Sequence, residues 1–309
     1  MENKPLIIFD TDMDTDCDDA GALAMLLHAH TQNKIELLGM IADSANRYAA
    51  PCCEAIAKSY GVSVSVGAIY ADECTGERFE AYLAHSKSCA EKGMDYNRVF
   101  AEEIGKIDRD YESAVTVYRK LLANAKEKSV TVLCVGMLTA ISAVLQSEAD
   151  EISPLSGIAM FKQKVEKVIT MGNPEKIPDF NWGMDAVATE IFFRLCPVPI
   201  YISAEGREVI TGEHLSKALP ETNLVRRAYE QWLGKPDCGR ASWDLIASLF
   251  AINPKTQYLT ATPLGDCVYD VQNKITQVVQ SKNPKCNKLH LNCTNQMMED
   301  FLNGCMLGK

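Results

Sequence analysis

Six of the ten residues from Asp10 to Asp19 are aspartates, and they stand between an apolar stretch and a stretch rich in Ala and Leu. Carboxylates this close together repel one another, and burying them without compensation is very costly. Either some of the acids hold protons, or a cation lies among them. Ligation by carboxylates favours a hard cation, Ca²⁺ or Mg²⁺. We expect one or two of the six to be solvated turn or N-cap residues and the others to surround an ion.

Two other aspartate motifs can be compared with this cluster. An EF-hand loop that started at Asp12 would need glycine at its sixth position and glutamate at its twelfth, where Cys17 and Leu23 stand. Phosphatases with an aspartyl nucleophile often carry D-x-D-x-[TV] after the first strand. The fifth residue from Asp10 is again aspartate, as it is from Asp12. A metal-dependent phosphatase-like hydrolase therefore stays as an alternative, although the motif is incomplete.

Apolar runs and helical stretches alternate along the chain. This pattern predicts an α/β fold with a mostly parallel central sheet, a Rossmann-related open sheet flanked by helices. The expected strands span residues 4–9, 35–41, 62–66, 130–135, 165–170 and 197–203, with hairpin strands within 258–291. The expected helices span residues 20–30, 50–60, 111–126, 139–146, 187–195, 215–233, 244–251 and 296–302. In such a sheet ligands bind at the carboxyl ends of the strands, and the aspartate cluster follows the first strand.

The composition limits the classes of function. The 309 residues carry a net charge of −10, which disfavours binding to nucleic acid or to an acidic membrane. No apolar run approaches the length of a membrane span or a signal peptide, so we expect a cytoplasmic protein. The twelve cysteines are scattered without a C-x-x-C pair and are expected to be reduced and buried. We expect one domain over residues 1–309, with a variable polar insertion near 72–97 that can cover a site.

The stretch D-T-D-x-x-x-D-x-D-D-A-x-A-L resembles the nucleoside hydrolase family. Further segments that resemble the family follow in the same order: ADSAN, LCVGMLTAI, ITMGNP with DFNWGMD, and SWDLIASLFAI. Together they span nearly the whole chain. The resemblance implies hydrolysis of the N-glycosidic bond of a ribonucleoside or related riboside, with Ca²⁺ at the bottom of the pocket. It also implies a homodimer or homotetramer.

The resemblance assigns roles residue by residue. It implies that Asp12 is the base that takes a proton from water and also a metal ligand. The other implied metal ligands are Asp19, Asp244 and the main-chain carbonyl of Val135. The implied substrate-binding residues are Asp18, Asn46, Met171, Asp179, Asn181, Trp182 and Trp243.

Two departures from the family pattern leave alternatives open. Five residues separate Asp12 from Asp18, where the commonest family motif has three. Other alignments of the cluster make Asp14 the base or place Asp16 on the ribose. Family members that act on purines and pyrimidines have histidine where Trp243 stands, and an indole cannot protonate a leaving base near neutral pH. A catalytically weak riboside-binding protein is therefore a further alternative.

Overall fold

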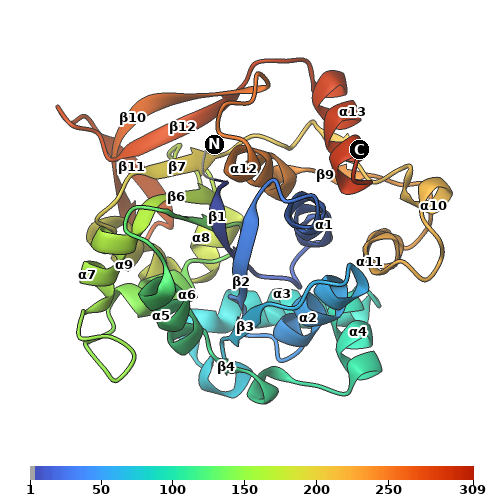
Figure 1. Cartoon of the computed structure of the whole chain (residues 1–309), viewed down its shortest axis with the longest axis horizontal. Coiled ribbons are helices and arrows are strands. Elements are labelled where there is room, and N and C mark those ends of the chain that lie inside the picture. Colours follow the sequence, from blue (N-terminus) through green and yellow to red (C-terminus); the bar gives the residue numbers. More distant parts are fainter. Residues whose placement is uncertain (1–3) are drawn as a thin grey trace.

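The computed structural model describes residues 4–309, and its centre is a ten-stranded sheet (Figure 1). The strand order is β11-β10-β12-β7-β6-β5-β1-β2-β3-β4. Neighbouring strands are parallel, except that β10 runs antiparallel to β11 and β12. The strand bounds are β1 Leu6–Thr11, β2 Glu36–Ala42, β3 Ser65–Ala68, β4 Glu112–Ser113, β5 Val130–Cys134, β6 Val165–Met171, β7 Ile200–Ser203, β10 Leu259–Asp270, β11 Ile275–Val279 and β12 Cys286–Leu291. The expected α/β fold with a mostly parallel sheet is therefore confirmed.

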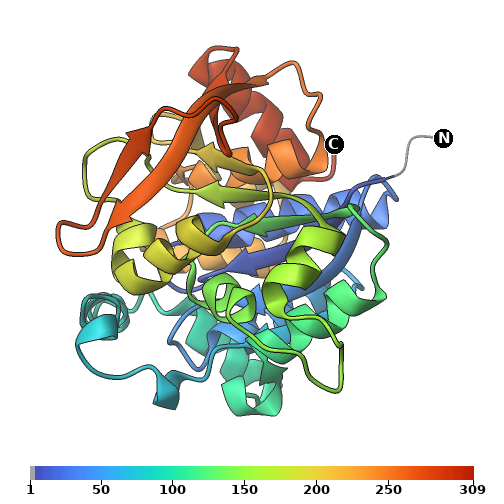
Figure 2. The same cartoon turned by 90° about the vertical axis from the view of Figure 1, so that its left-hand side faces the viewer.

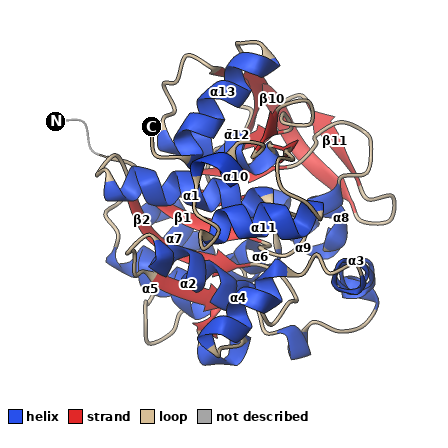
Figure 3. Cartoon of the chain, turned by 90° about the vertical axis from the view of Figure 1, so that its right-hand side faces the viewer, coloured by secondary structure: helices blue, strands red, loops and turns tan. Residues whose placement is uncertain are grey.

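Helices cover both faces of the sheet, and each face has its own apolar core between the sheet and the helices. Side chains of α1, α2, α11, α12 and α13 join one core, and those of α5, α6, α7 and α9 join the other. Figure 3 shows the first group from its own side, and Figure 2 shows β10–β12 at one edge of the sheet. The helix bounds are α1 Asp18–Thr31, α2 Ala49–Ser59, α3 Glu80–Glu91, α4 Tyr96–Ile104, α5 Ala114–Asn124, α6 Thr139–Leu145, α7 Gly157–Lys164, α8 Phe180–Met184, α9 Ala186–Leu195, α10 Leu215–Ala218, α11 Leu224–Leu233, α12 Trp243–Ile252 and α13 Asn295–Met306.

The first strand and the two helices that pack beside it place the acids. β1 is an apolar run that is almost wholly buried, as expected for a central parallel strand. α1 and α12 are apolar on nearly all sides and pack against each other. Asp18 and Asp19 occupy the first turn of α1, and Asp244 occupies the first turn of α12. Both helices therefore begin at the carboxyl edge of the sheet with an acid in the first turn, where the helix dipole favours negative charge.

Several expected elements differ from the structure. The single helix predicted at 215–233 is two helices, because Pro220 follows Leu219 in extended conformation and ends α10. The segment 72–97, expected as a polar insertion, contains α3 and the start of α4. The third strand lies at Ser65–Ala68, later than its predicted position, and α7 was not predicted. Within residues 4–309, no helix combines the length and the apolarity that crossing a bilayer requires.

Candidate active site

A cavity of about 720 Å³ opens at the carboxyl ends of the central strands. Asp12 follows β1, Val135 follows β5, Met171 ends β6 and Ala204 follows β7, and all four line the cavity. Residues of α1, α3, α8, the end of α11 and the start of α12 also contribute to the wall. This is the edge at which open α/β sheets bind their ligands.

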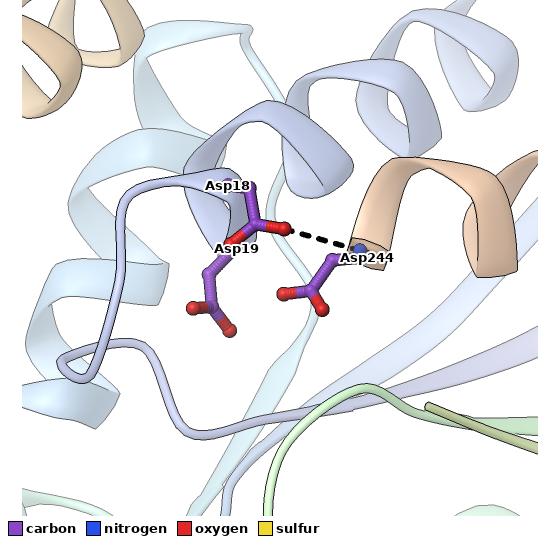
Figure 4. A group of neighbouring side chains, drawn as sticks. All are labelled: Asp18, Asp19 and Asp244. Atoms are coloured by element: carbon purple, nitrogen blue, oxygen red, sulfur yellow. Dashed lines mark hydrogen bonds between the residues drawn. The ribbon is translucent and has the colours of Figure 1, made fainter. Parts of the chain in front are cut away.

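Three carboxylates converge on the floor of this cavity (Figure 4). Asp18, Asp19 and Asp244, here called the acid trio, each offer an oxygen within 4.8 Å of the others. The Asp244 backbone N–H donates a hydrogen bond to the Asp18 carboxylate at 3.1 Å, which joins the first turns of α1 and α12. The Thr11 hydroxyl donates to Asp19 from the end of β1. Residues more than 220 positions apart in the sequence thus form one group of acids.

Asp12 lies in the same cavity, just outside the acid trio. Its carboxylate accepts a hydrogen bond from the Thr15 hydroxyl at 2.6 Å. A Cβ on Gly136 would lie 2.5 Å from the Asp12 nitrogen, so only glycine fits at position 136 without moving Asp12. Burial raises the pKa of Asp12 to about 7, and repulsion from Asp14 adds to the rise.

The acid trio fits a hard divalent cation. Burial raises the pKa of each of its three carboxyls well above the usual range, and repulsion from neighbouring carboxylates adds to it. The group is therefore unfavourable when fully ionised unless positive charge lies among the acids. The available donors are oxygens, which Ca²⁺ prefers. The Val135 carbonyl accepts from the Asn181 amide at 2.6 Å and keeps a second lone pair for another partner.

Two other aspartates of the cluster point elsewhere. Asp14 is buried, and its carboxylate accepts from the Tyr82 hydroxyl of α3 and from the Asn97 amide of α4 at 3.1 Å. Asp16 lines the cavity but is held by Arg240, with its closest N···O distance 2.6 Å. Each therefore has its own compensating partner. Asp12 has no such cation or amide partner among residues 4–309, and its carboxylate accepts from the Thr15 hydroxyl.

Another part of the wall comes from the start of α8. Asp179 caps this helix, and its carboxylate accepts from the backbone N–H groups of Trp182 and Asn173, both at 3.0 Å. Burial raises the pKa of Asp179 to about 6. Met171, Asp179 and Asn181 all line the cavity.

Two of the expected substrate-binding residues, Trp182 and Asn46, do not line this cavity. Trp182 has no exposed surface, and its indole N–H donates to the Thr170 hydroxyl at 3.3 Å. Its ring packs edge-on against Phe193, with the centroids 5.0 Å apart, so it is a core residue. The Asn46 amide donates to the Ser86 hydroxyl at 3.2 Å. Trp243, in contrast, lines the cavity.

Sequence reasoning missed part of the wall. Arg240 lies in β9 Arg240–Ala241, which pairs with β8 Ile210–Thr211 in a small separate sheet. No motif marks it, because its partner Asp16 is 224 positions away. His85 of α3 also lines the cavity and packs edge-on against Phe180, with ring centroids 4.9 Å apart. The one sequence signal for Arg240 was its location in the segment before α12, whereas His85, in the polar insertion, was already a candidate acid for the leaving group.

Comparisons with known proteins identify the family and agree with the fold. The family model described as inosine-uridine preferring nucleoside hydrolase matches residues 7–290. The inosine-uridine preferring nucleoside hydrolase of Bacillus anthracis has a TM-score of 0.65 at 14% identity, over 99% of this chain and 100% of that one. An inosine-guanosine nucleoside hydrolase has a TM-score of 0.68 at 15% identity, over 99% and 98%. The type III effector protein XopQ, complexed with adenosine diphosphate ribose, has a TM-score of 0.68 at 11% identity, over 100% and 94%. No curated protein matches the chain.

Proposed function

The chain belongs to the inosine-uridine preferring nucleoside hydrolase family, and from this membership we propose that it hydrolyses the N-glycosidic bond of a ribonucleoside or related riboside. The observation that carries the proposal is the acid trio, whose carboxylates converge within 4.8 Å on the floor of the cavity. We propose that Asp12, Asp19, Asp244 and the Val135 carbonyl hold Ca²⁺ there. Bound Ca²⁺ would orient the two ribose hydroxyls and lower the pKa of the attacking water.

The proposed hydrolysis gives each side chain of the site a separate role. The water oxygen forms a bond to C1′ of the sugar while the C1′–N bond breaks and its electron pair stays on the base. Asp12 accepts the proton of that water as the general base. The transition state carries positive charge on the sugar, and the surrounding carboxylates stabilise it. Asp18 accepts a hydrogen bond from a ribose hydroxyl.

The wall residues of β6 and α8 favour a ribose that lies between them and the acid trio. Asn181 and Asp179 bind the ribose from the α8 side, and Met171 packs against it. We propose Asp12 rather than Asp14 as the base, because Tyr82 and Asn97 already engage the Asp14 carboxylate outside the cavity wall. The phosphatase-like alternative needs an accessible nucleophile at the end of β1. Asp10 is fully buried with its carboxylate bonded by the Tyr118 hydroxyl, which speaks against that alternative.

Release of ribose from a panel of nucleosides, with Ca²⁺ and with chelator, measures this function. We expect turnover that chelator abolishes and added Ca²⁺ restores. Asp19→Asn should lose both turnover and Ca²⁺-dependent thermal stabilisation. Release that is unaffected by chelator, or no release from any nucleoside, contradicts the proposal.

A second function is a riboside-binding protein with little turnover. Trp243 in place of the histidine and the relative complexed with adenosine diphosphate ribose favour it. It predicts that ribosides raise the melting temperature in Ca²⁺ without releasing ribose. We further propose a cytoplasmic homodimer or homotetramer, and light scattering on the purified protein measures the number of subunits.

A further inference from the structure

The part of the cavity beside Asp244 carries Trp243, where the family pattern has a histidine that can act as an acid. When the C1′–N bond breaks, the base departs with an electron pair and develops negative charge. Trp243, which precedes Asp244, lines this part of the cavity, but its indole N–H does not ionise near neutral pH. If the chain is a riboside hydrolase as proposed above, another group must stabilise the departing base.

Arg240 lies beside Trp243 in the same cavity. Its guanidinium carbon is 5.2 Å from the centroid of the Trp243 ring, a stacked cation–π contact. Nε donates to both carboxylate oxygens of Asp16, at 3.0 and 2.8 Å, and Nη2 donates to one of them at 2.6 Å. The guanidinium is therefore fixed both in position and in plane.

Contacts of the main chain also fix the position of Arg240. β9 pairs with β8, and a Cβ on Gly239 would lie 2.5 Å from the Ile210 side chain. Burial alone would lower the pKa of Arg240, but the hydrogen bonds to Asp16 raise it. Arg240 thus stays protonated and can donate hydrogen bonds, but it cannot serve as a proton donor.

The fixed guanidinium keeps spare donors. An arginine side chain has five N–H groups, and those bonded to Asp16 belong to Nε and Nη2. Over residues 4–309, no hydrogen bond leaves Nη1. The Arg240 side chain keeps 37% of its surface exposed although Asp16 keeps only 15%. A cation with unused donors therefore borders the cavity next to an aromatic ring that can stack on a heterocycle.

We propose that Arg240 is the catalytic residue that stabilises the leaving base, by donating hydrogen bonds from Nη1 to the heterocycle as negative charge develops on it. No proton leaves Arg240. The proton of the attacking water goes to Asp12, and the base leaves as a hydrogen-bonded anion that takes a proton from solvent afterwards. Asp16 is a positioning residue that fixes the guanidinium, and Trp243 stacks on the base. Preorganised donors of this kind are worth about 10²–10³-fold in rate.

The test compares two kinds of leaving group. Nucleosides need help with departure of the base, whereas the nitrophenolate of nitrophenyl β-D-ribofuranoside leaves without it. We expect Arg240→Gln to lower kcat/KM for nucleosides by about 10²–10³-fold and to change that of the nitrophenyl riboside far less. Arg240→Lys keeps the charge without the planar fork and should recover only part of the loss. The dependence of rate on leaving-group pKa should become steeper in Arg240→Gln.

Arg78 offers a matched control. It forms a similar two-point pair with Asp185, at 2.7 and 2.5 Å, stacks 5.0 Å from the Phe79 centroid and has a side chain 40% exposed. It lies outside the cavity wall, so Arg78→Gln should leave the ratio of the two substrates unchanged. The double variant Asp16→Asn/Arg240→Gln removes both charges of the pair and should show the same substrate-selective loss even if Arg240→Gln alone folds poorly.

The outcomes separate this proposal from the proposed function. Equal losses on both substrates, or no loss on nucleosides, overturn the role of Arg240 and leave the hydrolase in place. Failure of the unmodified protein to cleave either substrate overturns both proposals. A loss confined to nucleosides, together with the steeper leaving-group dependence, supports Arg240.

Discussion

Neutralising one member of the acid trio should stabilise the metal-free protein and destabilise the Ca²⁺-loaded protein. Two unit charges 4.8 Å apart, the largest separation in the trio, repel by about 3.5 kcal/mol at an effective dielectric constant of about 20. Full ionisation of all three pairs would cost about 10 kcal/mol, which is comparable to the whole stability of many domains. Asp244→Asn removes two of the three pairs. It forfeits only about 0.3–1 kcal/mol of favourable interaction with the α12 dipole, so the relief of repulsion should dominate.

Partial protonation of the trio reduces the gain, because burial raises the pKa of each carboxyl. At about pH 8, where fewer of these protons remain, we expect Asp244→Asn to stabilise the apo protein by about 2–3 kcal/mol. For a chain of this size the melting temperature should rise by roughly 5 °C. In Ca²⁺ the order should reverse. A ligand at about 1,000 times its Kd stabilises the native protein by about 4 kcal/mol, and the variant lacks one ligand.

Thermal unfolding of both proteins in chelator and in millimolar CaCl₂ measures the reversal. Asp108→Asn is the matched control, because Asp108 is also buried but accepts hydrogen bonds from the backbone N–H groups of Ala71 and Arg109, at 2.8 and 2.9 Å. Its neutralisation should cost about 1–3 kcal/mol in both conditions, since a hydrogen-bonded acceptor is lost. An Asp244→Asn protein that is less stable than the parent in chelator at about pH 8 would refute the reasoning about repulsion.

Three further predictions follow from the same geometry. Asp12→Asn should lower kcat for riboside hydrolysis by about 10²–10⁴-fold. Asp14→Asn should mainly lower the melting temperature. A larger loss of kcat for Asp14→Asn than for Asp12→Asn would instead make Asp14 the base. Burial raises the pKa of Asp12 from 3.8 to about 7, so the folded apo protein binds more protons than the unfolded chain between these values. Its stability should therefore fall as pH rises from about 4 to 7, while Ca²⁺ affinity rises, as calorimetry at several pH values can measure. Gly136→Ala should displace Asp12 and abolish Ca²⁺ binding, since the added Cβ would lie 2.6 Å from Asp12 Oδ1. The control Gly304→Ala, whose added Cβ would have no atom within 4 Å, should leave Ca²⁺ binding intact.

The sequence predicted the elements that carry the acids, because local signals specify them. The apolar run of β1, the acidic first turn of α1 and the apolar α12 after Asp244 can each be recognised within a dozen residues. The resemblance to the family implied Asp12, Asp19 and Asp244 as metal ligands and Asp18 as a ribose ligand, and the structure brings Asp18, Asp19 and Asp244 together. The mostly parallel sheet followed from the alternation of strands and helices.

The side-chain partners could not be predicted in this way, because they depend on tertiary contacts. Asp14 and Asp16 look equivalent in the sequence, yet one bonds Tyr82 of α3 and the other pairs with Arg240 of β9. Trp182 and Trp243 each stand beside a predicted site residue, but only Trp243 reaches the cavity. An aromatic residue next to a site residue can face either the core or the ligand, and sequence spacing in a short helix does not decide between them.

The crowding of aspartates between β1 and α1 is tolerable because the acids are divided among several sets of partners. Asp10 lies beneath the floor with the Tyr118 hydroxyl, and burial raises its pKa to about 7. Asp12 and the acid trio share the floor, where a cation would compensate them. Asp14 and Asp16 lie between Asp12 and Asp18, where this chain has five residues and the commonest family motif has three. Their carboxylates turn away from the floor toward α4 and Arg240. The longer loop therefore adds no ligand to the floor. Through Asp16 it holds Arg240 on the side of the cavity where this chain has Trp243 in place of the family's histidine.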